Sequence, residues 1–129
     1  MKKDNTLRGV RVLSLALNLP GPAALLRVAQ MGAKCTKVNP PNGDPMALYT
    51  QDGYATLHTG VKEVSCDLKS NSGQKAMHQW LSKTDVLLTS FRPSALNKLG
   101  FGWKSLHQRY PQLSCVSVVG APGPLAEIP

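Results

Sequence analysis

Hydrophobic and polar residues form two alternating patterns along the chain. Short runs rich in apolar and β-branched residues predict buried β-strands, and apolar residues at helical spacing between them predict amphipathic helices. The strands are expected at 10–17, 35–39, 61–68, 85–89 and 113–119. The helices are expected from Pro22 to Gly32, after Ser70 or Asn71, from Pro93 to Gly100 and over 103–110. Residues 46–60 show no clear period and predict a loop with one helical turn.

Strands that alternate with helices are typical of βαβ units. The sequence therefore predicts one α/β domain over 1–129, with a Rossmann-like, mostly parallel sheet and flanking helices. The fifth strand is followed by a loop rich in Gly and Pro at 120–124, which leads to no further expected element. This ending predicts a fold that is incomplete.

Composition excludes several classes of protein. With 42% hydrophobic and 17% charged residues, the chain is neither a disordered tail nor a charged coiled coil. No apolar stretch is long enough to cross a bilayer, and the basic start lacks the apolar core of a secretory leader. Cys35, Cys66 and Cys115 are odd in number and far apart, which excludes a fully paired disulfide framework and a local zinc clip. We therefore expect a cytoplasmic protein without a metal or a membrane partner.

The net charge of +8 favours a polyanionic partner but does not identify it. The basic residues are scattered, and only two Phe, three Tyr and two Trp are available to stack on bases. Nucleic acid is therefore the least favoured partner. A phosphorylated ligand and a solvated basic surface both remain open.

Ligands of open α/β sheets bind beyond the carboxyl ends of the strands, which here are the loops 18–22, 39–45, 89–93 and 119–124. The Pro20-Gly21-Pro22 turn starts a helix, where free N–H groups favour an anion, although such a turn can also be only a turn. Arg92 follows a strand and Lys98 lies within two turns of it. Together they could hold phosphate, or they could be two exposed basic residues.

No convincing catalytic set is present. His78 and His107 are expected on outer helix faces, and His58, in the loop before the third strand, is the only histidine expected near a ligand. The acidic residues show no spacing typical of general acid–base pairs. The three cysteines are expected to pack as small hydrophobic residues in strands.

Several motifs, taken in order, resemble CoA-transferase family III, the group of formyl-CoA transferase, carnitine-CoA transferase and α-methylacyl-CoA racemase. Lys37-Val38-Asn39-Pro40-Pro41-Asn42-Gly43-Asp44 is similar to the family's KVEPPGGD stretch. Asp67-Leu68-Lys69-Ser70 is similar to LDLKSPEG, and Thr84-Asp85-Val86-Leu87-Leu88 with Phe91-Arg92-Pro93 is similar to ADVLVENFRPG. The similarity runs from about residue 7 to residue 124.

The resemblance implies a Rossmann-like CoA-binding domain of an enzyme that acts on acyl-CoA and forms an interlocked homodimer. Coenzyme A would lie across the strand ends. Carried over by position, the residues implied in CoA binding are Gly21, Pro22, Gly60, Lys62, Phe91, Arg92 and Lys98. No catalytic residue is assigned, because the family's nucleophilic Asp lies beyond the region that matches residue 124.

Several acidic positions of the family are neutral in this chain. Ser14 and Asn39 stand where Asp and Glu are usual, and Thr89-Ser90 replaces Glu-Asn. We expect the chain to be the N-terminal CoA-binding portion of a family III enzyme and to be inactive alone in CoA transfer or epimerisation. The alternative is a non-catalytic relic or an interaction module.

Overall fold

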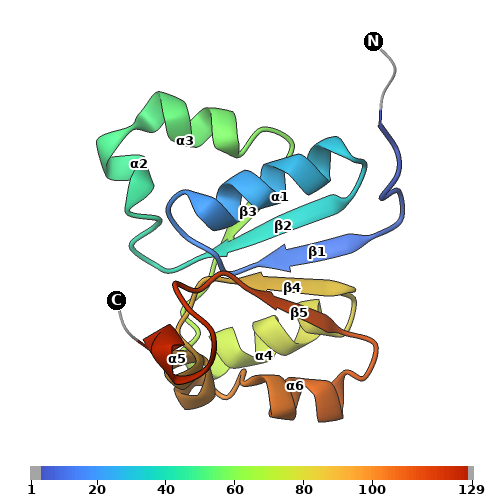
Figure 1. Ribbon diagram of the computed structural model, residues 1–129, viewed down its shortest axis with the longest axis vertical. Helices are drawn as coiled ribbons and strands as arrows, with labels where there is room; N and C mark the ends of the chain where they lie inside the picture. The colour runs from blue at the N-terminus through green and yellow to red at the C-terminus, as the bar shows by residue number, and fades with distance from the viewer. Residues whose placement is uncertain (1–3, 128–129) are drawn as a thin grey trace.

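The computed structural model describes residues 4–127, so residues 1–3 and 128–129 of the predicted domain lie outside the described residues. Five strands alternate with helices along this segment (Figure 1). The strands are β1 (Arg11–Ser14), β2 (Lys34–Asn39), β3 (Lys62–Ser65), β4 (Val86–Thr89) and β5 (Ser114–Ser117). The helices are α1 (Pro20–Gln30), α2 (Met46–Tyr49), α3 (Gln51–Leu57), α4 (Asn71–Leu81), α5 (Pro93–Leu99), α6 (Trp103–Arg109) and the 3₁₀ helix η1 (Gly123–Glu127).

All strand pairs are parallel and the strand order is β3-β2-β1-β4-β5. The chain moves outward from β1 to β3 and then returns to pair β4 with the other side of β1. The junction between β1 and β4 is therefore the point at which the strand order reverses, where ligands of such sheets bind. This arrangement confirms the predicted Rossmann-like α/β class.

Two apolar layers cover the sheet. Helices α1 to α3 lie on one face and α4 to α6 on the other (Figure 1). On the α4 face, Leu13 and Leu87 pack with Met77, Leu81 and other buried residues of the larger core cluster. The α1 face holds the smaller cluster. Its buried members are Val12, Ala16, Leu25, Ala33, Cys35 and Leu88.

The prediction for residues 46–60 was wrong, because two helices form there. Thr50 ends α2 and caps α3, where its side chain accepts a hydrogen bond from the Gly53 N–H. No residue of α3 is buried, so the segment lacks the apolar stripe from which a helix can be predicted in the sequence. The Tyr54 and His58 rings hold it against the sheet by polar contacts instead.

Smaller differences concern element ends. Helix α1 begins at Pro20 rather than Pro22, and η1 begins at Gly123, within the expected 120–124 loop. His107 is exposed as expected, but His78 is half-buried because its Nδ1 lies 2.8 Å from the Tyr110 hydroxyl. Cys66 lies just after β3 rather than within it. Among the described residues, no helix is long and apolar enough to cross a membrane.

Candidate functional site

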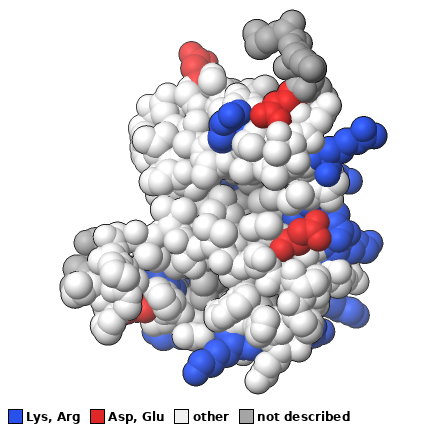
Figure 2. All heavy atoms as spheres, turned by 45° about the vertical axis from the view of Figure 1, so that its right-hand side comes forward, with Lys and Arg blue, Asp and Glu red and all other residues white. Residues whose placement is uncertain are grey.

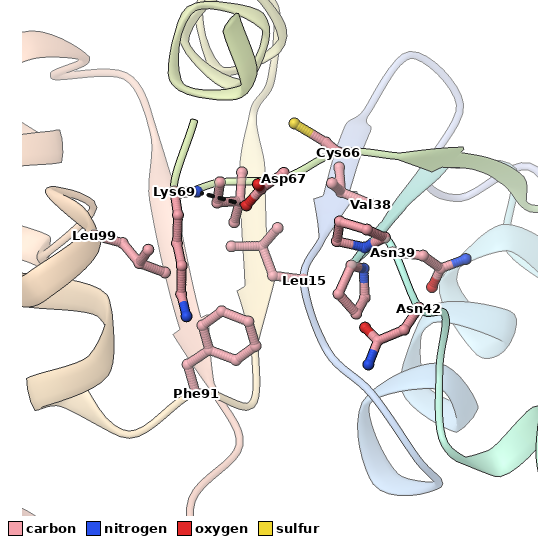
Figure 3. Close-up of a pocket in the computed structure, with 12 residues that line it drawn as sticks. Leu15, Val38, Asn39, Asn42, Cys66, Asp67, Lys69, Phe91 and Leu99 are labelled. Atoms are coloured by element: carbon pink, nitrogen blue, oxygen red, sulfur yellow. Dashed lines mark hydrogen bonds between the residues drawn. The ribbon is translucent and has the colours of Figure 1, made fainter. Parts of the chain in front are cut away.

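A groove opens at the carboxyl ends of the strands, and we call it the carboxyl-edge groove. Its volume is about 430 Å³, within the usual range for small-molecule sites. It is lined by Leu15, Val38, Asn39, Pro40, Pro41, Asn42, Cys66, Asp67, Leu68, Lys69, Phe91 and Leu99. Figure 3 shows Phe91, Lys69 and Leu99 on one side of Leu15, with Val38, Asn39 and Asn42 on the other. Segments that follow β1, β2, β3 and β4 thus meet at the reversal point of the sheet.

The groove continues into a hollow of about 500 Å³ with a basic rim. Lys69, Phe91 and Leu99 line both the groove and the hollow. Arg92 and Lys98 line the hollow but not the groove. The backbone N–H of Phe91 donates to Thr89 Oγ1 at 3.1 Å, which fixes the chain where β4 ends. Three cationic side chains therefore surround an apolar surface, an arrangement suited to a ligand with both phosphates and apolar parts.

One carboxylate lies near this basic rim. Glu127 of η1 accepts a hydrogen bond from the backbone N–H of Ser94 at 2.9 Å, at the start of α5. It also accepts one from the Ser94 hydroxyl at 2.5 Å. These hydrogen bonds, and then the nearby charges of Arg92 and Lys98, lower the pKa of Glu127. The amino end of α5 is thus already capped by an anion, so a ligand phosphate would meet the side chains of the rim instead.

A buried ion pair holds the loop that forms one wall of the groove. Lys37 of β2 is fully buried, and its Nζ donates to Asp44 Oδ2 at 2.5 Å. Asp44 also accepts from the backbone N–H groups of Asn18, at 3.1 Å, and Met46, at 3.0 Å. Burial alone would raise the pKa of Asp44, but the hydrogen bonds from Lys37, Met46 and Asn18 outweigh burial and lower it. One carboxylate therefore ties together the segments that follow β1 and β2.

His58 completes this buried cluster. Its Nε2 lies 2.7 Å from Lys37 Nζ, and its Nδ1 lies 2.7 Å from the carbonyl oxygen of Tyr54. Because an ammonium can only donate, Nε2 must accept and Nδ1 must carry the proton. The Tyr54 ring stacks on His58 at 3.8 Å. His58, the histidine expected near a ligand, is buried against Lys37 and lines no part of the carboxyl-edge groove.

The outer end of the cluster is formed by Tyr54, Glu63 and Asn39. The Tyr54 hydroxyl donates to Glu63 Oε1, and Asn39 Nδ2 donates to the same oxygen at 3.0 Å. Burial, and then the bond to Glu63, raise the pKa of Tyr54. For Glu63, burial acts to raise the pKa, but the bonds from Tyr54 and Asn39 outweigh it and lower the pKa. Asn39 Oδ1 is buried without a partner among the described residues, and Asn39 also lines the groove.

The structure brings together only some of the residues predicted to bind CoA. Phe91, Arg92 and Lys98 share the basic rim. Gly21 and Pro22 are buried at the start of α1, where a Cβ on Gly21 would collide with Ala16. Because α1 begins at Pro20, two of its first three residues are prolines without an N–H, which weakens the expected anion site there.

Gly60 and Lys62 lie elsewhere. Gly60 lines a separate hollow between α1 and α3. Lys62 begins β3 and lines a concave surface at the amino ends of the strands, the opposite edge of the sheet from Arg92. These two residues therefore share no surface with the carboxyl-edge groove.

Loop 39–45, placed at the strand ends from the sequence, lines the groove through residues that include Asn42. Sequence reasoning missed Lys69 and Cys66 as lining residues. Both follow the carboxyl end of β3, so the rule that ligands bind beyond strand ends could have found them. Burial raises the pKa of the Cys66 thiol, which makes it a poor nucleophile. Within residues 4–127, no three His, Cys, Asp or Glu side chains gather in a way that could hold a metal ion.

Comparison with known proteins connects this fold and groove to one family. Residues 7–129 match the model of CoA-transferase family III. The cinnamoyl-CoA:phenyllactate CoA-transferase of Clostridium sporogenes is 32% identical over 97% of this chain and 34% of its own length. The succinyl-CoA–D-citramalate CoA-transferase of Chloroflexus aurantiacus is 34% identical over 88% of this chain and 30% of its own length.

Solved structures give the same result. The crystal structure of the hypothetical protein Rv3272 from Mycobacterium tuberculosis has a TM-score of 0.89 and 30% identity, and the match covers 99% of this chain and 38% of that one. A CAIB/BAIF family protein from Brucella suis has a TM-score of 0.86 at 27% identity, with 97% of this chain and 36% of that one covered. The chain thus spans about a third of the length of these relatives, and it belongs to CoA-transferase family III.

Proposed function

We propose that the carboxyl-edge groove binds the CoA part of an acyl-CoA, and that the chain corresponds to the N-terminal CoA-binding portion of a family III enzyme. The observation that carries the proposal is the placement of Lys69, Arg92 and Lys98 around an apolar groove at the reversal point of the sheet. Family membership makes coenzyme A the expected ligand of such a site.

The residues present fit the chemistry of coenzyme A. Its phosphates require cationic donors, which Arg92 offers as a planar fork and Lys69 and Lys98 offer as point charges. Its apolar portions require a surface such as that of Leu15, Phe91 and the paired prolines. No residue of this groove is assigned to acyl chemistry. The role that we propose for this chain is to bind the CoA part of the acyl-CoA, within the homodimer that the resemblance implies.

The wider reaction follows from the family. The names of the Clostridium and Chloroflexus relatives describe exchange of CoA between two carboxylic acids. We propose that the whole enzyme, to which this portion belongs, carries out such an exchange or epimerises a 2-methylacyl-CoA, in the cytoplasm. Gly21, Pro22, Gly60 and Lys62 remain predicted from the resemblance, and the proposal for the groove does not depend on them.

A second candidate, an interaction module without CoA turnover, is favoured by one observation. β5 is an edge strand, and two exposed apolar residues, Val116 within it and Val119 just after it, are 48% and 37% exposed. Exposed apolar edge strands promote association with other chains. A compact monomer with a sharp thermal transition that binds CoA counts against this candidate, whereas association without CoA binding supports it.

Isothermal titration of the folded protein with CoA and acetyl-CoA tests the proposal. We expect binding in the micromolar range or weaker. Replacing both Arg92 and Lys98 by Gln should weaken it by about tenfold or more, because charge-assisted hydrogen bonds are worth about 1.5–3 kcal/mol each. Lys75→Gln, an exposed cation on α4 outside the groove, is the matched control and should leave binding unchanged. Folded wild-type protein that gives no heat with either ligand contradicts the proposal.

A further inference from the structure

We propose that the opposite, amino-terminal edge of the sheet carries a second anion site, one that takes a diphosphate group. We call it the amino-edge basic site. It is a concave surface of about 420 Å³, separate from the carboxyl-edge groove. The residues that the proposal uses are Arg11, Lys34, Thr36, Lys62, Trp80 and Lys83. Figure 2 brings this side of the molecule forward and shows Lys and Arg side chains along its right-hand edge.

Strand register places four of these side chains on one face of the sheet. Arg11 is the partner of Lys34, and Thr36 is the partner of Lys62. Lys34 and Thr36 are two residues apart on β2, so all four side chains point to the same face. Further along the strands, the same face carries Leu13, which packs on α4. The cations therefore occupy positions that face a helix layer, where apolar residues are usual.

Little acidic charge balances these cations. Arg11 pairs with Asp85, at 3.2 Å between Nε and Oδ2. Within residues 4–127, no Asp or Glu oxygen lies within 4.0 Å of the ammonium of Lys34, Lys62 or Lys83. Three ammonium groups from β2, β3 and the turn after α4 thus face one concavity without a counter-ion.

The end of α4 does not account for these lysines. Helix C-termini attract cations, and α4 ends beside the site. Its last carbonyls are already bonded, however: Trp80 O accepts from Lys83 N at 3.0 Å and from Thr84 Oγ1 at 2.7 Å, and Leu81 O accepts from Thr84 N at 3.2 Å. The ammonium groups therefore remain available to a ligand from outside.

The chemistry of the site favours linked phosphates over a single carboxylate. Three uncompensated point charges on adjacent elements match an anion that bears two or more charges on neighbouring groups. The Trp80 ring and the Thr36 hydroxyl add an apolar wall and a neutral donor. Both inorganic pyrophosphate and the diphosphate of a nucleotide present this chemistry.

Calorimetric titration with inorganic pyrophosphate and, separately, with ADP tests the site and distinguishes these two sources. The double variant Lys34→Gln/Lys62→Gln should weaken pyrophosphate binding at least tenfold, while the control Lys75→Gln, at an exposed cation on α4 that does not line the site, should leave it unchanged. Both lysines of the double variant are exposed, so the variant should fold, and its thermal transition checks this. If ADP binds more tightly than pyrophosphate, and if this difference disappears in Trp80→Leu, the ligand of the site is a nucleotide.

Two results overturn the proposal. One is a folded protein that gives no heat with pyrophosphate at low salt. The other is equal weakening of pyrophosphate binding by Lys75→Gln, which would indicate only general attraction to a basic surface. CoA titrations separate this proposal from that for the groove, because Lys34→Gln/Lys62→Gln should change CoA affinity less than Arg92→Gln/Lys98→Gln does. If the wild-type protein binds pyrophosphate but does not bind CoA, the groove proposal is contradicted and the proposal for the amino-edge basic site is not.

Discussion

The two edges of the sheet use positive charge in opposite ways. At the carboxyl edge, Lys37 is fully buried and forms an ion pair with Asp44, which holds the loops around the groove in place. At the amino edge, Lys34 and Lys62 are exposed and form no ion pair with any residue of 4–127. Lys34 and Lys37 lie three residues apart on the same strand and differ in which face they meet.

This difference separates structural charge from charge available to a ligand. A buried lysine with its hydrogen bonds satisfied organises the fold, and its loss leaves an unpaired carboxylate in the interior. An exposed lysine contributes little to stability, and its charge can act on an external anion. Substitutions at the two edges should therefore affect different measurements.

The largest effect is expected from Asp44→Asn, which leaves the buried Lys37 ammonium without its anion. We expect the free energy of unfolding to fall by about 3–5 kcal/mol, the usual cost of breaking a buried pair by removing one partner. Denaturant unfolding measures it. Asp52→Asn, on the exposed side of α3, is the control and should cost less than about 1 kcal/mol. Equal losses in both variants would mean that the pair does not organise this edge.

Acid should act on the same pair. The folded protein lowers the pKa of Asp44 below its usual value of 3.8, so the stabilisation is fully present above that value. It is lost as the pH falls through the lower folded pKa. The stability difference between wild type and Asp44→Asn, measured by denaturant unfolding from roughly pH 6 down to pH 3, should therefore shrink at the acid end. A difference that stays constant would show that Asp44 does not titrate with a lowered pKa.

A smaller loss is expected from Gly73→Ala. Gly73 lies in the first turn of α4, and an added Cβ would collide with the carbonyl of Asp67, in the turn that lines the groove. Overpacking of this kind typically costs about 1–3 kcal/mol, so the midpoint of thermal unfolding should drop. CoA affinity should drop as well, because Lys69 lies two residues after Asp67 in the same turn. Gly120→Ala, with open space around the new Cβ, should change neither quantity.

The smallest effect is expected from Glu127→Gln. Removing this carboxylate from the neighbourhood of Arg92 and Lys98 should raise CoA affinity by about twofold to fivefold, in line with the modest energies of exposed charge pairs. Pyrophosphate binding at the amino edge should not change. A fall in CoA affinity would instead show that the hydrogen bonds from Ser94 to Glu127 support CoA binding more than the negative charge of Glu127 opposes it.

Much of the fold followed from the sequence, because β1 and β4 contain apolar runs and because Gly32 and Pro40 bound β2. Helix α3 did not, since it packs through the polar contacts of Tyr54 and His58, which apolar periodicity does not reveal. At the site, Arg92 was found because it lies in the loop that follows β4, and Lys98 because it lies within two turns of Arg92. The burial of Lys37 could not be predicted, because it depends on partners that lie 7 and 21 residues away in sequence.

The most direct test of the account is amide NMR mapping of isotope-labelled protein during titration with CoA. The account predicts that the largest shift changes occur at Lys69, Phe91, Arg92 and Lys98, on the carboxyl edge of the sheet, with small changes at Lys34 and Lys62. Changes concentrated at Lys34 and Lys62, or no specific changes in folded protein, would contradict the assignment of the carboxyl-edge groove to coenzyme A.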